Sequence, residues 1–252
     1  MKKLVVRRQK SVVGLIGYGR FGKLLAQLLS KRFSIVIFDS SAKTNSKKGG
    51  NISFTSIEEI ALQKIIILAV PINQIQNVLR QISPFVQKDV LVIDVCSVKE
   101  KPIQWMKQLL PKSVSILGTH PMFGPDSAKD RIKGKTIVLC PERILNPQLN
   151  AIKKRLKKNG LNVIVTTSTE HDKQVAYTQA LVHFFARSWN AMQLPPQKIT
   201  TESFSKLNEI SRTLMNDSEE LFFDMHRYNR FAKEASRVYQ KKILNLEKII
   251  NQ

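Results

Sequence analysis

The chain has 252 residues, which is enough for one large domain or two modest ones with their own cores. Its two cysteines, Cys96 and Cys140, lie far apart, so neither a disulfide framework nor a metal site is expected. No long apolar run occurs, and the signal-like start at residues 1–8 regains charge after three apolar residues. We therefore expect a cytoplasmic protein with no membrane partner.

The formal net charge of +22 raises the question of nucleic acid. Residues 170–252 carry 12 Lys and Arg against 10 Asp and Glu, so +20 of the charge lies in residues 1–169. No basic run is interleaved with aromatic residues, and lysines such as Lys43, Lys47 and Lys48 are scattered. A solvated basic surface and no nucleic-acid partner are predicted. A non-catalytic nucleic-acid- or dinucleotide-binding protein is the alternative, and steeply salt-dependent binding would favour it.

The first two thirds of the chain alternate short β-branched runs with amphipathic stretches. Strands are predicted at residues 12–16, 34–38, 64–70, 90–95, 114–117, 136–139 and 161–166, and helices at 21–29, 72–82 and 147–158. This pattern predicts an α/β fold with a Rossmann-type doubly wound parallel sheet over residues 1–168. Residues 169–252 predict a smaller all-helical domain, broken mainly near residues 194–196.

A glycine-rich turn follows the first predicted strand and opens the first predicted helix. Its spacing is Gly17-x-Gly19-x-x-Gly22. One glycine permits the tight turn, the next lets the backbone approach a pyrophosphate, and the third lets helix and strand pack closely. The predicted cofactor-binding residues are Gly17, Tyr18, Gly19, Arg20, Phe21, Gly22, Asp39, Val70 and Pro71.

The end of the second predicted strand distinguishes the two nicotinamide cofactors. Asp39 lies 22 positions after Gly17, where a carboxylate hydrogen-bonds ribose hydroxyls and repels a 2′-phosphate. NAD is therefore favoured over NADP. Ser40, Ser41 and Lys43 remain as groups that could accommodate a phosphate.

Residues 118–127 place a histidine, His120, between a threonine and a proline after an apolar run. A loop this rich in Gly and Pro fixes the imidazole at the end of a strand, as a general base requires. An ordinary turn with an incidental histidine is the alternative. Ser97 follows the preceding strand and is predicted both as the N-cap of a helix at residues 99–110 and as a hydroxyl near His120.

Taken together, these segments resemble the prephenate/arogenate dehydrogenases of tyrosine biosynthesis. The likeness is carried by residues 17–22, 94–99, 119–127, 170–172, 177–184 and 212–217, and it covers about residues 11–235. The type found elsewhere fused to chorismate mutase is the one most resembled, although this chain has no room for a mutase domain. Another two-domain dehydrogenase, such as a 3-hydroxyacid type, would use a catalytic lysine instead.

The resemblance implies oxidative decarboxylation of prephenate. His120 would accept the proton of the ring hydroxyl while hydride leaves for NAD, and Ser97 would hold hydroxyl and imidazole aligned. Loss of CO2 then gives 4-hydroxyphenylpyruvate. Asp126 lies in the same loop, where an acidic group would favour the amino group of arogenate, so arogenate dehydrogenase is the alternative.

The resemblance also assigns residues of the helical domain to the substrate. Arg212 would grip a carboxylate bidentately, although alone it reads as a surface arginine. His171 would face the cleft, or would only pair with Asp172 at a helix start. Gln179 and His183 share a helix face at i, i+4, with His183 as readily a core histidine. A homodimer through the helical domain is expected.

Overall fold

The computed structural model describes residues 11–41, 47–48, 50–128 and 131–252. The signal-like start at residues 1–8 and Lys43 lie outside the described residues, as do the side chains of Lys47 and Lys48. Within the described ranges, no helix combines the length and the apolar character needed to cross a bilayer.

In this part of the chain nine strands form one sheet in the order β3-β4-β2-β1-β5-β6-β7-β8-β9. The core of the sheet is parallel, as predicted, from β4 through β7. The strands are β1 (Val12–Ile16), β2 (Ser34–Phe38), β3 (Lys47–Lys48), β4 (Ile52–Phe54), β5 (Ile65–Leu68), β6 (Leu91–Asp94), β7 (Ser115–Pro121), β8 (Thr136–Arg143) and β9 (Asn162–Val165).

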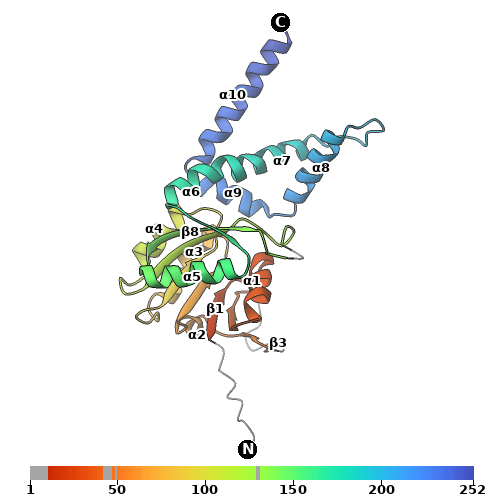
Figure 1. Ribbon diagram of the computed structural model, residues 1–252. Helices are drawn as coiled ribbons and strands as arrows, with labels where there is room; N and C mark the ends of the chain where they lie inside the picture. The colour runs from red at the N-terminus through yellow and green to blue at the C-terminus, as the bar shows by residue number, and fades with distance from the viewer. Residues whose placement is uncertain (1–10, 42–46, 49, 129–130) are drawn as a thin grey trace, which may run out of the picture.

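Helices cover both faces of this sheet (Figure 1). On one face, α2, α3 and α4 pack their apolar sides on inward residues of β5, β6 and β7. On the other face, α1 packs on β1 and β2, and α5 packs on β7 and β8. The doubly wound α/β arrangement is therefore confirmed. These helices are α1 (Arg20–Ser30), α2 (Ile57–Ala61), the 3-10 turn η1 (Ile72–Gln74), α3 (Ile75–Ile82), α4 (Glu100–Leu109) and α5 (Asn146–Lys158).

The sheet departs from the prediction at β7 and β8. Strand β7 continues to Pro121 instead of stopping at Leu117, and it pairs antiparallel with β8. His120 lies opposite Val138 in that pairing, so it is part of the strand rather than of a loop after it. Local Gly and Pro content favours a loop, but pairing with a neighbouring strand overrides that local preference.

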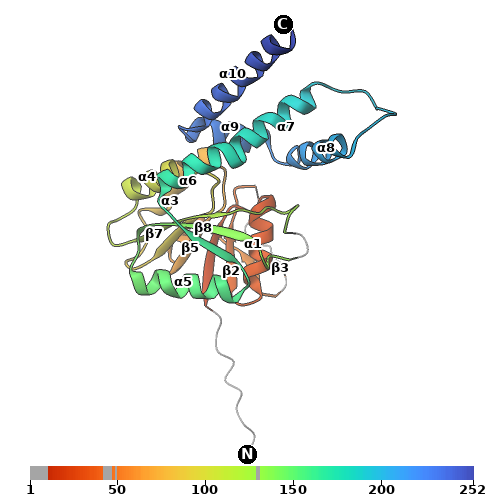
Figure 2. The ribbon, with the colours of Figure 1, turned by 45° about the horizontal axis from the view of Figure 1, so that its top comes forward.

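The remaining chain is helical and lies at the carboxyl ends of the strands. It comprises α6 (Ser168–Val175), the π-helical turn η2 (Ala176–Ala180), α7 (Leu181–Ala191), α8 (Glu202–Leu214), α9 (Glu219–Tyr228) and α10 (Ala232–Ile250). Figure 2 shows α6 and α9 over the sheet domain, while α8 and the far part of α10 extend away from it. The predicted break at residues 194–196 falls in the irregular segment between α7 and α8.

The two parts are joined by specific contacts near η1 and α4. The backbone amide of Asn73 donates to the Asp224 carboxylate of α9 at 3.1 Å, and the Asn73 side chain donates to Glu220 at 2.8 Å. The rings of Trp105 and Tyr228 meet edge to face with centroids 5.3 Å apart. The helical part is thus packed onto the sheet domain at its carboxyl edge.

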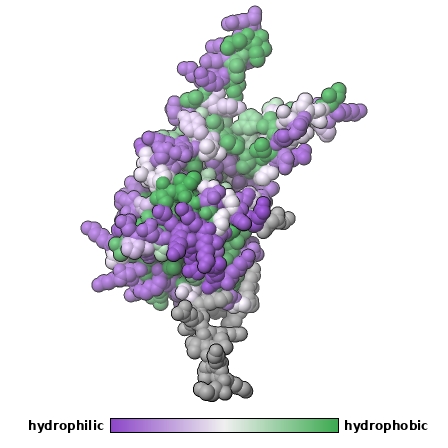
Figure 3. Space-filling model, in the orientation of Figure 1, coloured by the Kyte–Doolittle hydropathy of each residue, from purple (hydrophilic) through white to green (hydrophobic). Residues whose placement is uncertain are grey.

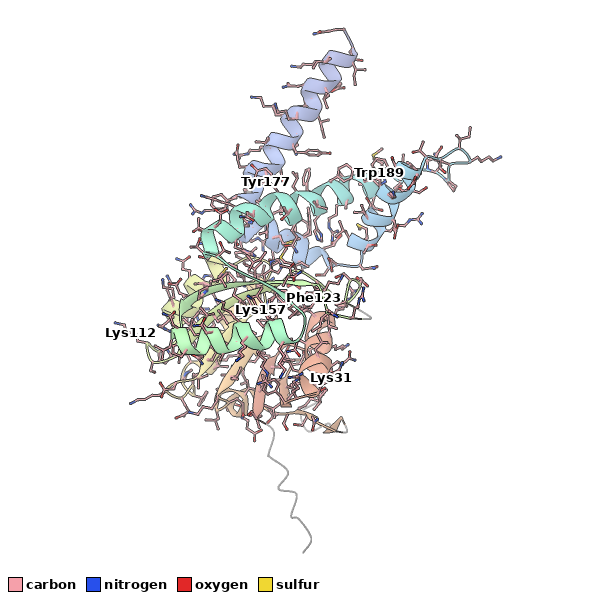
Figure 4. The ribbon with its side chains drawn as sticks, in the orientation of Figure 1. Lys31, Lys112, Phe123, Lys157, Tyr177 and Trp189 are labelled. Carbon is pink, nitrogen blue, oxygen red and sulfur yellow. The ribbon has the colours of Figure 1, made fainter. Side chains whose placement is uncertain are left out.

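Much of the positive charge lies on the outside of the sheet domain. Lys31, Lys112 and Lys157 are exposed, and Figure 4 shows Lys112 at the left edge of that domain and Lys157 on α5. Helix α5 contains basic residues and no acidic ones. These positions agree with a solvated basic surface, because isolated exposed lysines keep their hydration.

Candidate active site

The glycine turn after β1 has two glycines that packing requires and one that it does not. Gly17 has φ of 100°, and a Cβ there would lie 2.3 Å from the Ala69 carbonyl oxygen. A Cβ on Gly22 would lie 2.2 Å from the Gly17 carbonyl oxygen. At Gly19 a Cβ would meet nothing within 4 Å. Gly17 and Gly22 therefore allow the turn to close, and Gly19 leaves the open space that a dinucleotide phosphate needs.

Helix α1 begins at Arg20 without a side-chain cap in the described residues, so its first amides are available to an anion. Asp39, at the end of β2, accepts from the Tyr18 amide at 2.6 Å and from the Ser41 amide at 3.0 Å. Burial raises the pKa of Asp39, but the hydrogen bonds from Ser41 and Tyr18 outweigh it and lower the pKa overall. An anionic Asp39 therefore stands beside the turn.

The other predicted cofactor residues border the same turn. Phe21 is half-buried in the first turn of α1. Val70 follows β5, with its side chain next to Gly17, and Pro71 precedes η1. The hydroxyl of Ser41 donates to Asp39, so the group suggested for a 2′-phosphate is engaged with the carboxylate instead.

His120 lies at the carboxyl end of β7 with 4% of its surface exposed. Its Nδ1 is 2.9 Å from Nε2 of His171, which α6 places over the end of the strand. Burial, reinforced by His171 and by the positive charge of Lys99, holds the pKa of His120 well below its ordinary value. The imidazole is therefore neutral near pH 7, as a proton acceptor must be.

His171 is in turn bonded to the next residue. Its Nδ1 lies 2.7 Å from Oδ1 of Asp172, and both residues are buried. Burial lowers the pKa of His171 and outweighs the hydrogen bond to Asp172, which raises it. The carboxylate also accepts from the amides of Lys99 at 2.8 Å and Glu100 at 2.9 Å. His171 was predicted to face the cleft or only to pair with Asp172, and in the structure it contacts both His120 and Asp172.

Ser97 does not cap α4, so that part of its prediction is wrong. The N-cap position belongs to Lys99, and the first amides of α4 are bonded by Asp172 from α6. Because a carboxylate from another helix already satisfies these amides, the Ser97 hydroxyl is left without a hydrogen-bond partner in the described residues. Its Oγ is buried, and a buried hydroxyl without a partner carries a desolvation cost that a hydrogen bond to a ligand hydroxyl would offset.

A buried ion pair lies beneath these groups and was not predicted. Lys99 and Asp94 are in direct contact with both side chains fully buried. The Lys99 ammonium also donates to the Thr119 carbonyl oxygen at 2.6 Å, next to His120 in the chain. The only sign in the sequence is a lysine five positions after Asp94, which ends an apolar strand. We call the group of Lys99, His120, His171 and Asp172 the inner junction.

A second set of contacts joins the same two parts at the rim. Arg20 donates to both oxygens of Asp126, at 3.0 Å and 2.8 Å, and to the Asn216 carbonyl oxygen at 2.6 Å. Its guanidinium lies 3.7 Å from the Asp217 carboxylate. These side chains are 48%, 39% and 34% exposed for Arg20, Asp126 and Asp217. We call Arg20, Asp126 and Asp217 the outer junction; Asp217 was not predicted.

His183 is buried on α7 beside the outer junction. Its Nε2 lies 3.7 Å from Asp217, and its Nδ1 has no partner in the described residues. Burial, with the charges of Arg187 and His226, lowers the pKa of His183 to about 4. Gln179 is half-buried in the π-helical turn, so the regular helical spacing assumed for the pair is interrupted there.

Arg212 lies apart from the inner junction. It is exposed on α8 and lines a hollow of about 680 Å³ together with Trp189, Gln193 and Asn208. Figure 4 shows Trp189 at the end of α7 that points away from the sheet domain. No residue of the inner junction lines this hollow. The structure therefore does not bring Arg212 to His120 within the chain.

Neither cysteine belongs to a reactive site. Cys96 and Cys140 are both buried and free, and burial raises the pKa of Cys140 to about 12. Both thiols are therefore protonated at neutral pH and chemically inert. Among the described residues, no group of three or more His, Cys, Asp or Glu side chains is placed to hold a metal ion.

A Rossmann-type sheet with an uncapped glycine turn, and a buried neutral histidine at the carboxyl edge, define the class of two-domain dinucleotide-binding proteins. The family model described as "Prephenate dehydrogenase, nucleotide-binding domain" matches residues 25–165, which is more than half of the chain. The chain belongs to the prephenate dehydrogenase family. A second description, "TYRAAT1-like, C-terminal domain", matches residues 189–250.

Relatives of known name carry the same family names. A protein of Methanocaldococcus jannaschii, named a probable arogenate/prephenate dehydrogenase, is 27% identical over 95% of this chain and 56% of its own length. Arogenate dehydrogenase 1 of Arabidopsis thaliana is 28% identical over 88% of this chain and 36% of its own length. The chain thus spans about half of the first relative and about a third of the second. The narrower likeness to the type fused to chorismate mutase is not borne out.

Solved structures share the fold. Prephenate dehydrogenase of Aquifex aeolicus, in complex with hydroxyphenyl propionate and NAD+, superposes with a TM-score of 0.76. The match has 20% identity and covers 99% of this chain and 92% of that one. Synechocystis arogenate dehydrogenase superposes with a TM-score of 0.69 at 20% identity, covering 95% and 92% of the two chains. The fold predicted from the sequence is therefore confirmed.

Proposed function

We propose that the protein oxidises and decarboxylates prephenate to 4-hydroxyphenylpyruvate with NAD as hydride acceptor, a step of tyrosine biosynthesis. The observation that carries the proposal is the buried, neutral His120 at the carboxyl end of β7, in a chain of the prephenate dehydrogenase family. A general base with a lowered pKa at this edge of the sheet suits removal of a hydroxyl proton near a nicotinamide.

The glycine turn fits the dinucleotide. Open space at Gly19, free amides at the start of α1 and an anionic Asp39 are the features that pyrophosphate and ribose hydroxyls require. Arg20 lies at the same helix end and adds positive charge. NAD bound there would be the hydride acceptor. Asp39 favours NAD over NADP because a 2′-phosphate would meet its negative charge.

In the proposed reaction His120 takes the proton of the C4 hydroxyl while the C4–H bond gives up hydride. The C1–carboxylate bond then breaks, its electron pair enters the ring, and CO2 leaves as the ring becomes aromatic. The unpartnered Ser97 hydroxyl donates to or accepts from the C4 oxygen and keeps it aligned with His120. Aromatisation drives the reaction, so orientation and proton removal are the tasks of the protein.

The helical residues 169–252 are proposed as the substrate domain, and residues 1–168 as the dinucleotide domain. Asp126 and His183 lie at the outer junction, where a substrate side chain would enter, and Gln179 lies in the π-helical turn that precedes α7. His171 contacts His120 directly. Arg212 lies apart from the inner junction of its own chain. Its proposed role with a substrate carboxylate therefore requires a different site.

Arogenate is the second candidate substrate. Two carboxylates, Asp126 and Asp217, share one arginine, Arg20, at the outer junction. A surplus of negative charge there would favour the ammonium group of arogenate over the keto group of prephenate. Two of the relatives named above also carry arogenate in their names.

The chain is further proposed to act in the cytoplasm and as a homodimer through the helical domain. Support for the dimer comes from the apolar surface of that domain, which Figure 3 shows in green on α10 and near α7. The exposed apolar side chains of α10 are Val238, Ile243, Leu244, Leu246, Ile249 and Ile250. Such a surface on a monomer is costly to leave in water.

The test is NAD(P)H formation by the purified protein with prephenate and arogenate, each with NAD and NADP. Turnover with prephenate and NAD supports the proposal, and turnover only with arogenate moves the assignment to the second candidate. Absence of turnover with all four pairs would overturn the tyrosine-pathway assignment. Salt-dependent binding to RNA or DNA would then be measured.

A matched pair of glycine variants tests the cofactor site separately. Gly19→Ala is expected to keep the stability of the wild type, because its methyl would contact no protein atom. The methyl would occupy the space proposed for the pyrophosphate, so NAD binding should weaken by about tenfold or more. Gly22→Ala is expected to destabilise the fold, because its methyl meets the Gly17 carbonyl. Titration calorimetry and thermal unfolding measure the two effects. Unchanged NAD affinity in Gly19→Ala would contradict the site.

A further inference from the structure

Three buried side chains form a line of hydrogen bonds from the helical domain to the catalytic histidine. Oδ1 of Asp172 is 2.7 Å from Nδ1 of His171, and Nε2 of His171 is 2.9 Å from Nδ1 of His120. All three residues are almost fully removed from solvent. We propose that Asp172, acting through His171, is a positioning residue that fixes the tautomer of His120 with the lone pair on Nε2. The proposal rests on the function proposed above.

The tautomers of His171 and His120 can be assigned by starting from Asp172. Among the described residues, the Asp172 carboxylate is bonded by two backbone amides and by a ring nitrogen of His171. It therefore acts as an acceptor, and His171 carries its proton on Nδ1. A neutral His171 then has only a lone pair on Nε2. Nδ1 of His120 must donate to that lone pair, and a neutral His120 is left with its own lone pair on Nε2.

That orientation is the one the reaction needs. In the described part of the chain nothing bonds Nε2 of His120, so this nitrogen is the one available to a substrate hydroxyl. The other tautomer would present an N–H there and could not accept a proton. Since burial lowers the pKa of both His120 and His171, both rings stay neutral and the line keeps its direction.

Asp172 is itself held on every side. Its two oxygens accept from the Lys99 and Glu100 amides at the start of α4, where the helix dipole favours a negative charge. Its backbone carbonyl oxygen accepts from the Asn229 side chain at 2.8 Å. The carboxylate therefore cannot rotate away from His171 without breaking contacts to α4. The Asp172 carboxylate thus links α6, the first helix of the helical domain, to the segment that carries Ser97.

The direct test is nitrogen NMR of the protein labelled in histidine, without substrate. We expect His120 and His171 both to show a protonated Nδ1 and an unprotonated Nε2 between about pH 7 and about pH 8. In Asp172→Ala we expect His120 to lose this single tautomer and to show signals of both. A protonated Nε2 on His120 in the wild type would overturn the proposal, and this readout requires no variant to fold.

Kinetics give the second readout. Asp172→Ala and Asp172→Asn are expected to lower kcat by about 10²- to 10⁴-fold, as wrong-tautomer variants of histidine-dependent enzymes do, with NAD affinity unchanged. Ser56→Ala is the matched control, because it removes the N-cap hydrogen bond of α2 without touching the line, and it should keep kcat. If Asp172→Ala lost no more kcat than Ser56→Ala, Asp172 would have a structural role only.

The two readouts separate this proposal from the proposed function. Turnover with prephenate together with a protonated Nε2 on His120 would overturn the positioning role and leave the reaction standing. The expected tautomers without turnover on any substrate pair would overturn the reaction, and with it the catalytic purpose of the line.

Discussion

The inner and outer junctions connect the same two parts of the molecule in different ways. The inner junction consists of groups that are almost fully buried, and each of them bonds a group from the other part. The outer junction consists of side chains that are a third to a half exposed. Buried charges and hydrogen bonds are strong and intolerant of change, whereas exposed ion pairs contribute little. The inner junction is therefore suited to fixing chemistry, and the outer one to admitting a substrate.

The largest effect is expected at the centre of the inner junction. His120→Asn removes the proton acceptor and should lower kcat by about 10²- to 10⁴-fold, the usual contribution of a general base. Dinucleotide affinity should not change, since Gly19 and Asp39 follow other strands, β1 and β2. Steady-state kinetics together with NAD titration measure both quantities. Wild-type turnover in this variant would show that another group takes the proton.

The buried ion pair gives the largest expected change in stability. Lys99→Met leaves the buried Asp94 without its cationic partner, which should cost about 3 to 5 kcal/mol of unfolding free energy. The matched control is Lys107→Met, which breaks an ion pair with Glu142 whose side chains are 52% and 30% exposed. That control should cost less than about 1 kcal/mol. Equal losses in denaturant unfolding would contradict the distinction between buried and exposed pairs.

The lowered pKa of His120 sets the pH dependence of turnover. Because burial disfavours its proton, the neutral form persists below the ordinary value of 6.5. The acid limb of kcat is therefore expected below about pH 6.5. A limb at or above that value would show that His120 is solvated, or that it is not the base.

The free energy of unfolding should also decrease as the pH falls. A histidine whose pKa is lower in the folded than in the unfolded state favours folding fully when the pH is above the unfolded-state pKa. That contribution is lost as the pH falls through the folded-state pKa. For His183 the window runs from 6.5 down to about 4. Melting temperatures measured across this window should fall less steeply in His183→Gln than in the wild type. Parallel curves would indicate that His183 titrates normally.

The smallest effect is expected at the outer junction. Arg20→Met removes the exposed pair with Asp126 and should change the unfolding free energy by less than about 1 kcal/mol. If the loss approached that of Lys99→Met, the outer junction would be as rigid as the inner one. Substrate preference between prephenate and arogenate, measured in the same variant, tests whether the two carboxylates act on the side chain of the substrate.

The sequence was most informative where chemistry and local pattern coincide. Strands β1 and β2 begin and end at the predicted residues, because apolar β-branched runs in a parallel sheet are bounded by clear turns. The glycine turn and His120 were also placed at the carboxyl ends of strands, which is where they lie in the structure. These positions depend on neighbours close in the chain.

Contacts between distant segments could not be predicted. Strand β7 extends through His120 and Pro121 only because β8 pairs with it. Lys99 and Asp172 become site residues because α6 is folded onto α4, 73 residues away in sequence. The same packing leaves the Ser97 hydroxyl without a hydrogen-bond partner in the described part of the chain. Residue type alone does not distinguish a lysine buried against Asp94 from the exposed lysines of α5.

The central claim is that a buried, neutral His120 accepts the hydroxyl proton as hydride leaves the substrate. It is tested most directly by a single-turnover experiment with NAD and prephenate, in which NADH and CO2 are both quantified for the wild type and for His120→Asn. The account predicts equal amounts of NADH and CO2 from the wild type and neither, on that timescale, from the variant. Equal product from both proteins would contradict it.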